Sequence, residues 1–364
     1  MYSLFAYVTA KKLLGSLFGF LAEISLLLNI ITLIAVFRLA FLAKRNQVYT
    51  IAFFNSLCDV FHVALDVFYL APSIVFNSYL VSPTQKNEWT LLLGSCFMFF
   101  WYFETATRVI MAINRYVVIC LQKHKTFSFN STLFLFLFLI PICFAMMFLS
   151  QYVNPCCSFL FDHEYLSYSY FTIDGVPNYS NMFDIPLNTT TSVVSAICYL
   201  SILWKVHNTN PTCTLSMNAH KVRLKRDIRY AVQFSLLFVF HTIGYILLRV
   251  LPLIFHNEQK EWHILVPLFF LLDCSANAVI YLGFNVEVQK NIYPAGLRSM
   301  FKAFGLSGDT MEGVSDNPPH TVSMVMNEIA RTAGRARSIT ALVIPKRRIQ
   351  PFKSIGLRRT SRMV

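Results

Sequence analysis

Charged side chains stand inside apolar stretches of this sequence, and the chemistry open to them there is ion pairing. Glu104 and Arg108 are four residues apart in a stretch rich in Phe, Met and Ile. On a helix, this spacing stacks the two side chains one turn apart and permits an ion pair. A charge at membrane depth costs roughly 2.5–3.5 kcal/mol by insertion scales, so such residues face a helix bundle and pair there. We therefore predict a buried polar network that joins Glu104 and Arg108 to Asp59 and Asp273.

The pair belongs to a longer stripe of residues at helical spacing. The members recur at three- and four-residue steps, and they are Phe97, Trp101, Glu104, Arg108, Met111 and Arg115. Asp66 and Glu23 offer further carboxylates in neighbouring stretches. Two interpretations stay open. The network either fixes the register of the helices, or it is a bistable element that rearranges when a ligand binds.

The sequence contains no recognisable catalytic pattern. It has no phosphate-binding glycine loop, no nucleophile beside a positioned base and no zinc-ligand spacing among its nine Cys. We interpret His62 and His241 as helix contacts rather than metal ligands. The sequence thus predicts a protein that is not an enzyme and that has no cofactor and no metal site.

The composition indicates which elements must position these residues. Of the 364 residues, 55% are apolar and 13% are charged, which is about half the charged fraction of a soluble domain. Because backbone amides in lipid must be bonded within their own segment, each long apolar stretch is expected to be a helix. We predict an all-α membrane protein, a bundle of seven transmembrane helices at Leu13–Ala43, Val48–Phe76, Thr90–Leu121, Ser131–Val153, Pro186–Val206, Ile228–Phe255 and His263–Phe284.

Lys and Arg residues indicate the orientation, because cytoplasmic connections hold their excess. The connection Gln151–Ile185 contains neither, whereas the second and third inner connections and the C-terminal part are basic. We predict a multi-pass plasma-membrane protein with its N-terminus outside. Its predicted parts are an extracellular N-terminus at 1–12, the transmembrane domain at 13–285, an amphipathic juxtamembrane helix at 286–300 and a disordered basic cytoplasmic tail at 301–364.

The net charge of +13 is concentrated between and after the apolar stretches, with no nucleic-acid recognition motif around it, so no nucleic-acid partner is predicted. The tail has too little apolar surface to fold alone. Anionic inner-leaflet lipids attract each nearby basic residue by about 1 kcal/mol, so we expect the tail to lie on the bilayer. The alternative is a solvated tail whose charge only helps to fix the orientation.

Two motifs narrow the function of such a bundle. They stand at the inner ends of the third and seventh stretches, as Asn114-Arg115-Tyr116 and as Asn277 and Tyr281. The first resembles the Asp-Arg-Tyr motif of rhodopsin-like receptors. The second is similar to the Asn-Pro-x-x-Tyr motif of the same receptors, with Ala in place of Pro.

The outer connection narrows the resemblance further. Its Pro-Cys-Cys-Ser-Phe-Leu-Phe-Asp segment at 155–162, with a Tyr-rich continuation, is similar to the nematode serpentine chemoreceptors of the Srx class. The resemblance covers roughly Leu13 to Lys290. It implies a seven-helix fold, a pocket for a small-molecule ligand that opens to the outside, and a heterotrimeric G protein as partner. A seven-span ligand-gated channel and a secondary transporter stay open as alternatives.

The resemblance also implies a role for the inner motif residues. In this family the Arg of the first motif is restrained at rest and engages the G protein when active. The predicted G-protein coupling residues are therefore Asn114, Arg115, Tyr116, Asn277 and Tyr281. Because Asn114 replaces the usual acid, we expect raised basal activity unless another Asp or Glu restrains Arg115. The alternative is an arginine that only snorkels to the membrane surface.

A cleft between helices is where bundles bind small molecules. The predicted pocket residues come from the third and sixth stretches, and they are Phe97, Trp101, Tyr102, His241, Tyr245 and Arg249. Helix packing is the alternative role for these side chains. Arg249 either attracts an anionic ligand or pairs with Glu258 or Glu261.

Two covalent modifications are expected in the outer connection. Cys156 and Cys157 face the oxidising side, and one of them is a candidate to bridge to Cys96; an adjacent pair also permits one bridged and one free Cys. Asn178 begins a glycosylation sequon in this connection, whereas Asn130 begins one in an inner connection. Only Asn178 is therefore predicted to carry glycan.

Overall fold

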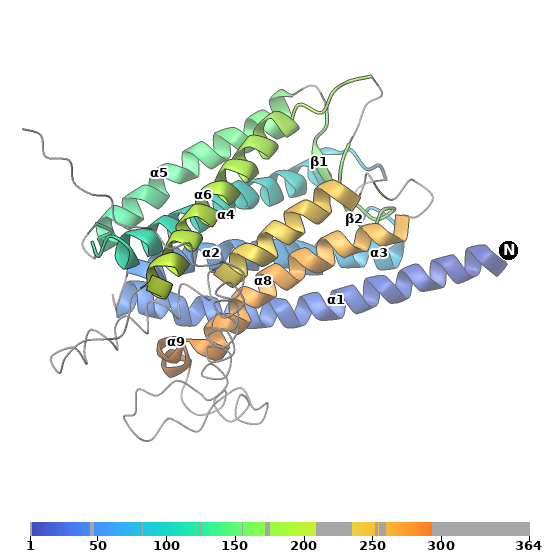
Figure 1. The fold of residues 1–364 in the computed structure, drawn as a ribbon. Helices are drawn as coiled ribbons and strands as arrows, with labels where there is room; N and C mark the ends of the chain where they lie inside the picture. Colours follow the sequence, from blue (N-terminus) through green and yellow to red (C-terminus); the bar gives the residue numbers. More distant parts are fainter. Residues whose placement is uncertain are drawn as a thin grey trace, which may run out of the picture. The chain divides into compact units, whose positions relative to one another are not determined.

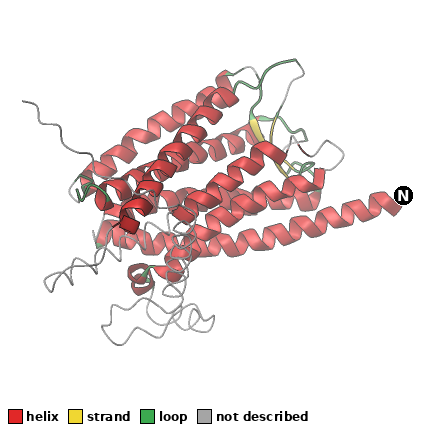
Figure 2. Ribbon diagram, in the orientation of Figure 1, coloured by secondary structure: helices red, strands yellow, loops and turns green. Residues whose placement is uncertain are grey.

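The computed structural model describes residues 2–43, 47–81, 83–123, 126–154, 156–171, 175–208, 235–251, 254 and 260–292. These residues form a bundle of long helices (Figure 1). Figure 2 shows that helices make up most of the described chain, with one short strand pair at one end of the bundle. The predicted tail at 301–364 lies outside the described residues.

Six helices are long and apolar enough to cross a membrane, and a shorter apolar helix at Ser235–Leu251 is the described part of the predicted sixth span. Wider π-helical turns continue several of them. The elements are α1 (Tyr2–Phe37) with the turn Arg38–Leu42, α2 (Gln47–Leu65) with the turn Asp66–Leu70 and α3 (Ala71–Phe76), α4 (Glu88–Ile119), α5 (Phe129–Phe148) with the turn Leu149–Val153, α6 (Asn181–Asn208), and α8 (Leu265–Phe284) after the 3-10 turn Lys260–Ile264. The predicted helical membrane fold is confirmed.

Capping residues explain where two of these helices begin. The Oδ1 atom of Asn87 accepts a hydrogen bond from the Trp89 amide at 3.1 Å, while the Asn87 amide donates to Thr90 Oγ1 at 2.9 Å. This capping box fixes the start of α4. Ser128 caps α5, because its Oγ accepts from the Ser131 amide at 3.1 Å.

Pro72 shapes the end of the second span. It stands in the first turn of α3, directly after the π-helical turn Asp66–Leu70. Proline has no amide hydrogen to donate to the preceding turn, and a wider turn accommodates that loss. α3 ends at Asn77, which adopts a left-handed φ of 53°.

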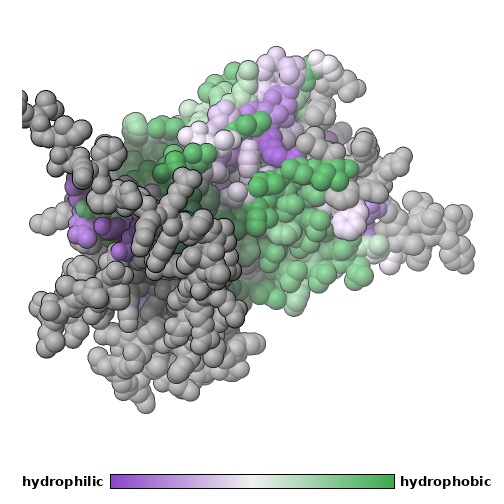
Figure 3. Space-filling model, viewed as in Figure 1, coloured by the Kyte–Doolittle hydropathy of each residue, from purple (hydrophilic) through white to green (hydrophobic). Residues whose placement is uncertain are grey.

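α4 is the central helix of the bundle. It packs against α2, α5, α6 and the strand pair, while α1 packs against α2, α3 and α8. The outward faces of α1 and α5 expose large apolar side chains, such as Phe20 at 59%, Phe134 at 72% and Phe138 at 58%. Figure 3 shows a broad apolar surface over the helices on one face. Exposed apolar side chains of this kind suit helices that contact lipid.

A two-stranded antiparallel hairpin covers one end of the bundle. β1 (Phe159–Asp162) pairs with β2 (Ser167–Tyr170), with Phe159 opposite Tyr170 and Phe161 opposite Tyr168. Because side chains alternate along a strand, these four aromatic residues lie on the same face of the hairpin. The sequence predicted a connection here without strands.

Both ends of the described chain differ from the predicted boundaries. α1 begins at Tyr2, so the predicted separate N-terminus at 1–12 is largely a continuation of the first helix. After α8, the helix α9 (Val286–Asn291) occupies the start of the predicted juxtamembrane helix at 286–300, and residues 293–300 lie outside the described residues. The Tyr49 hydroxyl donates to Glu287 Oε2 at 2.8 Å, which attaches α9 to α2.

Candidate functional site

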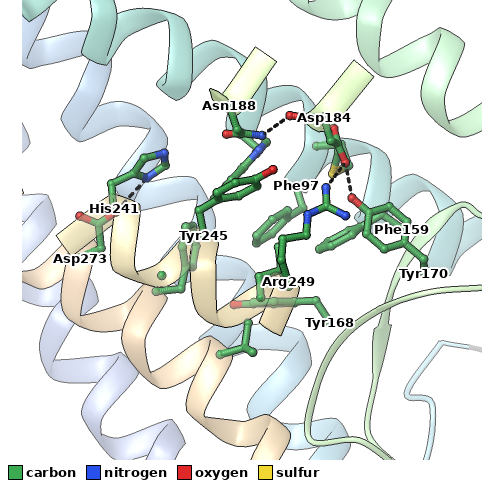
Figure 4. Close-up of a pocket in the computed structure, with 16 residues that line it drawn as sticks. Phe97, Phe159, Tyr168, Tyr170, Asp184, Asn188, His241, Tyr245, Arg249 and Asp273 are labelled. Carbon is green, nitrogen blue, oxygen red and sulfur yellow. Dashed lines mark hydrogen bonds and ion pairs between the residues drawn. The ribbon is translucent and has the colours of Figure 1, made fainter. Parts of the chain in front are cut away.

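A cavity lies among the helices at the hairpin end of the bundle (Figure 4). α4, α6, α8, the helix Ser235–Leu251 and both strands contribute to its wall. Its empty volume is about 520 Å³, counted to its open mouth. Clefts between the helices of a bundle are places where proteins bind small molecules.

Aromatic rings form much of the cavity wall. The ring of Phe97 on α4 stacks on Phe159 of β1, with ring centroids 4.9 Å apart. One turn further along α4, Trp101 lies 5.7 Å from Phe270 and 5.2 Å from His241. Rings at these distances interact favourably in offset or tilted arrangements. The wall therefore offers flat apolar faces to a ligand.

Asp184 on α6 is the polar centre of the wall near the hairpin. The Tyr102 hydroxyl donates to its Oδ1 atom at 2.7 Å, and the Tyr170 hydroxyl donates to Oδ2. Arg249 Nη2 lies 3.5 Å from the same Oδ2 atom. Burial, reinforced by the Asp184 carboxylate, raises the pKa of Tyr170 well above its usual value, so the hydroxyl stays protonated and keeps donating.

The partners of Arg249 differ from the two acids that the sequence suggested. Its Nη1 atom donates to Asn181 Oδ1 at 2.7 Å, and its charge faces Asp184. It does not pair with Glu261 in the described part of the chain, and Glu258 lies outside that part. The actual partners are on α6, which packs beside the sixth span; sequence separation gave no sign of this proximity.

The floor of the cavity continues into a buried ionic network. His241 Nδ1 lies 3.3 Å from Asp273 Oδ2, and both residues line the cavity. Behind them, Arg108 donates to both carboxylate oxygens of Asp273, at 2.9 and 3.2 Å. The same guanidinium donates to Glu104, whose Oε2 atom lies 3.2 Å from His62 Nδ1. The structure thus brings together three of the four predicted network residues.

The other predicted carboxylates have different partners. Asp59 Oδ2 accepts hydrogen bonds from Asn277 and from Asn55, the latter at 3.2 Å, rather than from the guanidinium. Asp66 accepts from a hairpin tyrosine, and Glu23 is exposed on α1. The predicted network is therefore divided, because Asp59 Oδ2 accepts from two amide side chains and not from Arg108.

The network contains a set of atoms with the geometry of a metal site. Ligand atoms of Glu104, His241 and Asp273 lie within 4.8 Å of one another. The guanidinium of Arg108 is bonded to both carboxylates, so a positive charge already occupies the position that a cation would need. The arrangement supports an internal ion-pair network better than it supports a metal centre.

The predicted coupling residues gather at the opposite end of α4 and at the end of α8. Asn114 and Arg115 are buried, at 0% and 1% exposure. The burial of Arg115 differs from the interpretation that it snorkels to the membrane surface. Asn277 and Tyr281 are also buried, whereas Tyr116 is half-buried.

The disulfide differs from the predicted bridge between Cys96 and the outer connection. Cys156 and Cys157 are bonded to each other, and Cys96 is a free thiol. Cys96 is exposed on α4, so its side chain points away from the buried adjacent pair. The expectation of a bridge to Cys96 is therefore corrected, and so is that of one bridged and one free Cys.

Noncovalent contacts hold the hairpin against the bundle. At Gly94, an added Cβ atom would lie 2.0 Å from the carbonyl oxygen of Phe159, so only glycine permits this approach of β1 to α4. Gln151 Oε1 accepts from the Phe159 amide at 3.1 Å. Ser180 Oγ donates to the Cys157 carbonyl at 3.2 Å. Together, these contacts place the aromatic face of the hairpin in the cavity wall.

The cavity wall includes most of the predicted pocket residues and several others. Those that line it are Phe97, Trp101, His241, Tyr245 and Arg249, whereas Tyr102 is bonded to Asp184 without lining the cavity. Other wall residues were not predicted from the sequence, among them Phe159, Tyr168, Tyr170, Asp184, Asn188 and Phe270. The alternation of aromatic residues along 159–161 and 168–170 was the available signal for the hairpin members.

Asn178 and Asn130, which begin two of the glycosylation sequons, lie in different surroundings. Asn178 is half-buried, and its Oδ1 atom accepts from the Ser180 amide at 3.0 Å. Asn130 is exposed in the first turn of α5. Glycosylation of Asn178 stays a prediction.

Comparisons with known proteins found one matching family and a similar solved structure. A family model described as "Serpentine type 7TM GPCR chemoreceptor Srx" matches residues 16–285. The crystal structure of squid rhodopsin is similar in fold, with a TM-score of 0.65 and 13% sequence identity over 83% of this chain and 89% of that chain. None of the curated proteins matches the chain.

Proposed function

Because the chain belongs to the Srx family of serpentine seven-transmembrane G-protein-coupled chemoreceptors, we propose that it binds a small external cue in the cavity and activates a heterotrimeric G protein. The resemblance predicted from its motifs is confirmed, and the chain is a multi-pass membrane protein. We place the hairpin end of the bundle outside the cell and the Arg115 end in the cytoplasm of a plasma-membrane receptor. The basic inner connections support this orientation.

One observation carries the proposal: the floor of the cavity is bonded to α4. His241 and Asp273 face the cavity, and Asp273 is also bonded to Arg108 of α4. Arg115 is seven residues further along the same helix, which is two turns or about 10 Å on nearly the same face. A ligand that displaces His241 or Asp273 therefore acts on the helix that ends at the proposed coupling residues.

The proposed mechanism is a change of partners around Arg108. The guanidinium is shared between Glu104 on its own helix and Asp273 on α8. A ligand that favours one of these arrangements shifts the population of receptor states by its difference in affinity for them. Such coupling between sites is typically about 1–3 kcal/mol. We propose that this shift exposes Arg115 and its neighbours to the G protein.

The test is Arg115→Ala in cells that carry a G-protein reporter. We expect near-normal surface expression and loss of signalling, because the guanidinium is the proposed contact with the partner. Signal is normalised to receptor copies at the surface, which separates coupling from folding of this buried residue.

Arg38→Ala is the matched control, because Arg38 begins the turn that ends α1, at the same end of the bundle. The control should signal like the unmodified receptor. Equal signalling from Arg115→Ala would remove the basis for coupling through α4. A ligand-evoked current in cells without any G protein would support a channel instead.

A further inference from the structure

The charges around the cavity are already matched by partners of opposite charge. Arg249 faces Asp184 near the hairpin, and Asp273 is bonded to Arg108 at the floor. A ligand with a net charge would therefore enter a poorly solvated site without a free counter-charge, and such burial is unfavourable. The described wall thus favours a ligand without net charge.

Two buried polar atoms near Asp184 have no hydrogen-bond partner among the described residues. One is a donor, the Nε–H group of Arg249, and the other is an acceptor, the Oδ1 atom of Asn188. Both residues line the cavity. Buried polar atoms without partners destabilise a protein, so each one calls for an explanation.

Neighbouring contacts fix the orientation of both groups. Asn188 Nδ2 donates to the Asp184 backbone carbonyl at 2.8 Å, which leaves Oδ1 as the amide atom that is available to accept. Arg249 Nη1 donates to Asn181, and its guanidinium lies over the ring of Tyr245 at 5.5 Å from the centroid. Figure 4 shows Asn188 and Arg249 next to Asp184, and dashed lines join each of them to it.

We propose that the cavity takes an uncharged organic molecule with a flat apolar body, whose polar end presents an acceptor to Arg249 and a donor to Asn188. Aromatic amides have this pattern, with a carbonyl oxygen and an N–H group on one functional group. The body lies against the rings of Phe97, Trp101 and Phe270. This inference rests on the proposed function only in taking the cavity as the ligand site.

The test uses four probes with a similar phenyl body and different polar ends. They are 2-phenylacetamide, phenylacetate, 2-phenylethylamine and ethylbenzene, which carry an amide, an anion, a cation and no polar group. Binding to the purified full-length receptor in lipid nanodiscs is measured by saturation-transfer NMR and by the shift of the thermal unfolding midpoint. We expect the amide to bind more tightly than the other three.

Two variants test the assigned atoms. Asn188→Leu removes the acceptor and keeps a similar side-chain volume. It should weaken binding of the amide about fivefold, because one hydrogen bond is lost. Ethylbenzene makes no hydrogen bond, so its binding should not weaken in this variant. Thr190→Leu is the matched control, because Thr190 is exposed on the same helix.

Arg249→Lys keeps the charge opposite Asp184 but lacks the Nε donor. It should also weaken binding of the amide selectively.

Each other result has a distinct meaning. Tighter binding of phenylacetate would overturn the inference in favour of an anionic ligand on Arg249. Equal binding of ethylbenzene and the amide would overturn it too, since the polar atoms would then contribute nothing. If no probe binds while another cue still activates the G protein, the inference fails and the proposed function stands. If the amide binds as expected but no ligand evokes G-protein signalling, the proposed function fails and the ligand class stands.

Discussion

Arg108 donates to two carboxylates that lie on different helices, Glu104 on α4 and Asp273 on α8. All three side chains are buried or nearly so, and His62 and His241 extend the network on either side. A buried ion pair is weak evidence for stability, because its desolvation offsets much of its attraction. A guanidinium that is bonded to carboxylates on two helices is better suited to stabilising one of two arrangements of those helices.

Glu104→Gln distinguishes the two interpretations of this network. The amide keeps an acceptor for Arg108 but removes the negative charge, so the guanidinium should move toward Asp273. If the network is bistable, we expect basal nucleotide exchange on the G protein to rise roughly fivefold, which corresponds to about 1 kcal/mol. The measurement is ligand-independent exchange per folded receptor in membranes.

Glu88→Gln provides the control for this substitution, because Glu88 is an exposed acid in the first turn of the same helix, α4. It should change neither exchange nor stability. A Glu104→Gln receptor with a lower unfolding midpoint and unchanged basal exchange would mean that the network only fixes helix register.

Single residues differed in how far the sequence revealed them. The pairing of Glu104 with Arg108 follows from their spacing on one helix. Asp184 was missed, because its partners Tyr102, Tyr170 and Arg249 come from three other elements of the chain. Spacing along one helix gives no information about such contacts.

Among the helices and strands, the hairpin is the element that the hydropathy of the sequence did not reveal. Each of its strands has only four residues, and the face toward the bundle is aromatic. The hydropathy of the whole connection is that of an outer loop. The helices were easier, because a span needs a long apolar run and leaves a clear signal. The predicted pocket residues came only from α4 and the sixth span, and the wall residues of α6 and of the hairpin were not predicted.

Gly94→Ala tests whether close contact with α4 holds the hairpin in place. The new methyl group would lie 2.0 Å from the Phe159 carbonyl oxygen, so the backbone of β1 must move. We expect a loss of about 1–3 kcal/mol in stability, as for other overpacked sites. Thermal unfolding in detergent should show a lower midpoint, and chymotrypsin should cleave within 159–170 faster.

Gly283→Ala is the same substitution on α8 at a position where an added Cβ meets nothing within 4 Å. It should be neutral or slightly stabilising, because Ala favours a helix over Gly by roughly 0.8–1 kcal/mol. Equal behaviour of the two variants would show that the contact at Gly94 does not hold the hairpin.

Glycosylation sequons report how the whole molecule is oriented in the membrane. Asn178 follows the hairpin connection, and Asn130 stands at the start of α5 near the other end of the bundle. We expect glycosidase treatment to shift the electrophoretic mobility of the receptor and of Asn130→Gln, but not that of Asn178→Gln. A shift that disappears in Asn130→Gln and persists in Asn178→Gln would mean that the bundle has the opposite orientation.

The bond between Cys156 and Cys157 joins neighbours in the chain, so it ties the hairpin to no helix in the described part of the protein. The hairpin can therefore lift from the cavity by breaking hydrogen bonds and packing contacts alone. Loop movements typically take nanoseconds to microseconds, and the opening of a lid takes microseconds to seconds. If the proposed cue binds beneath this cover, reducing agents should not change its residence time, because the disulfide joins the hairpin to no described helix. A receptor that releases its ligand quickly responds to the present concentration of that ligand and not to an earlier exposure.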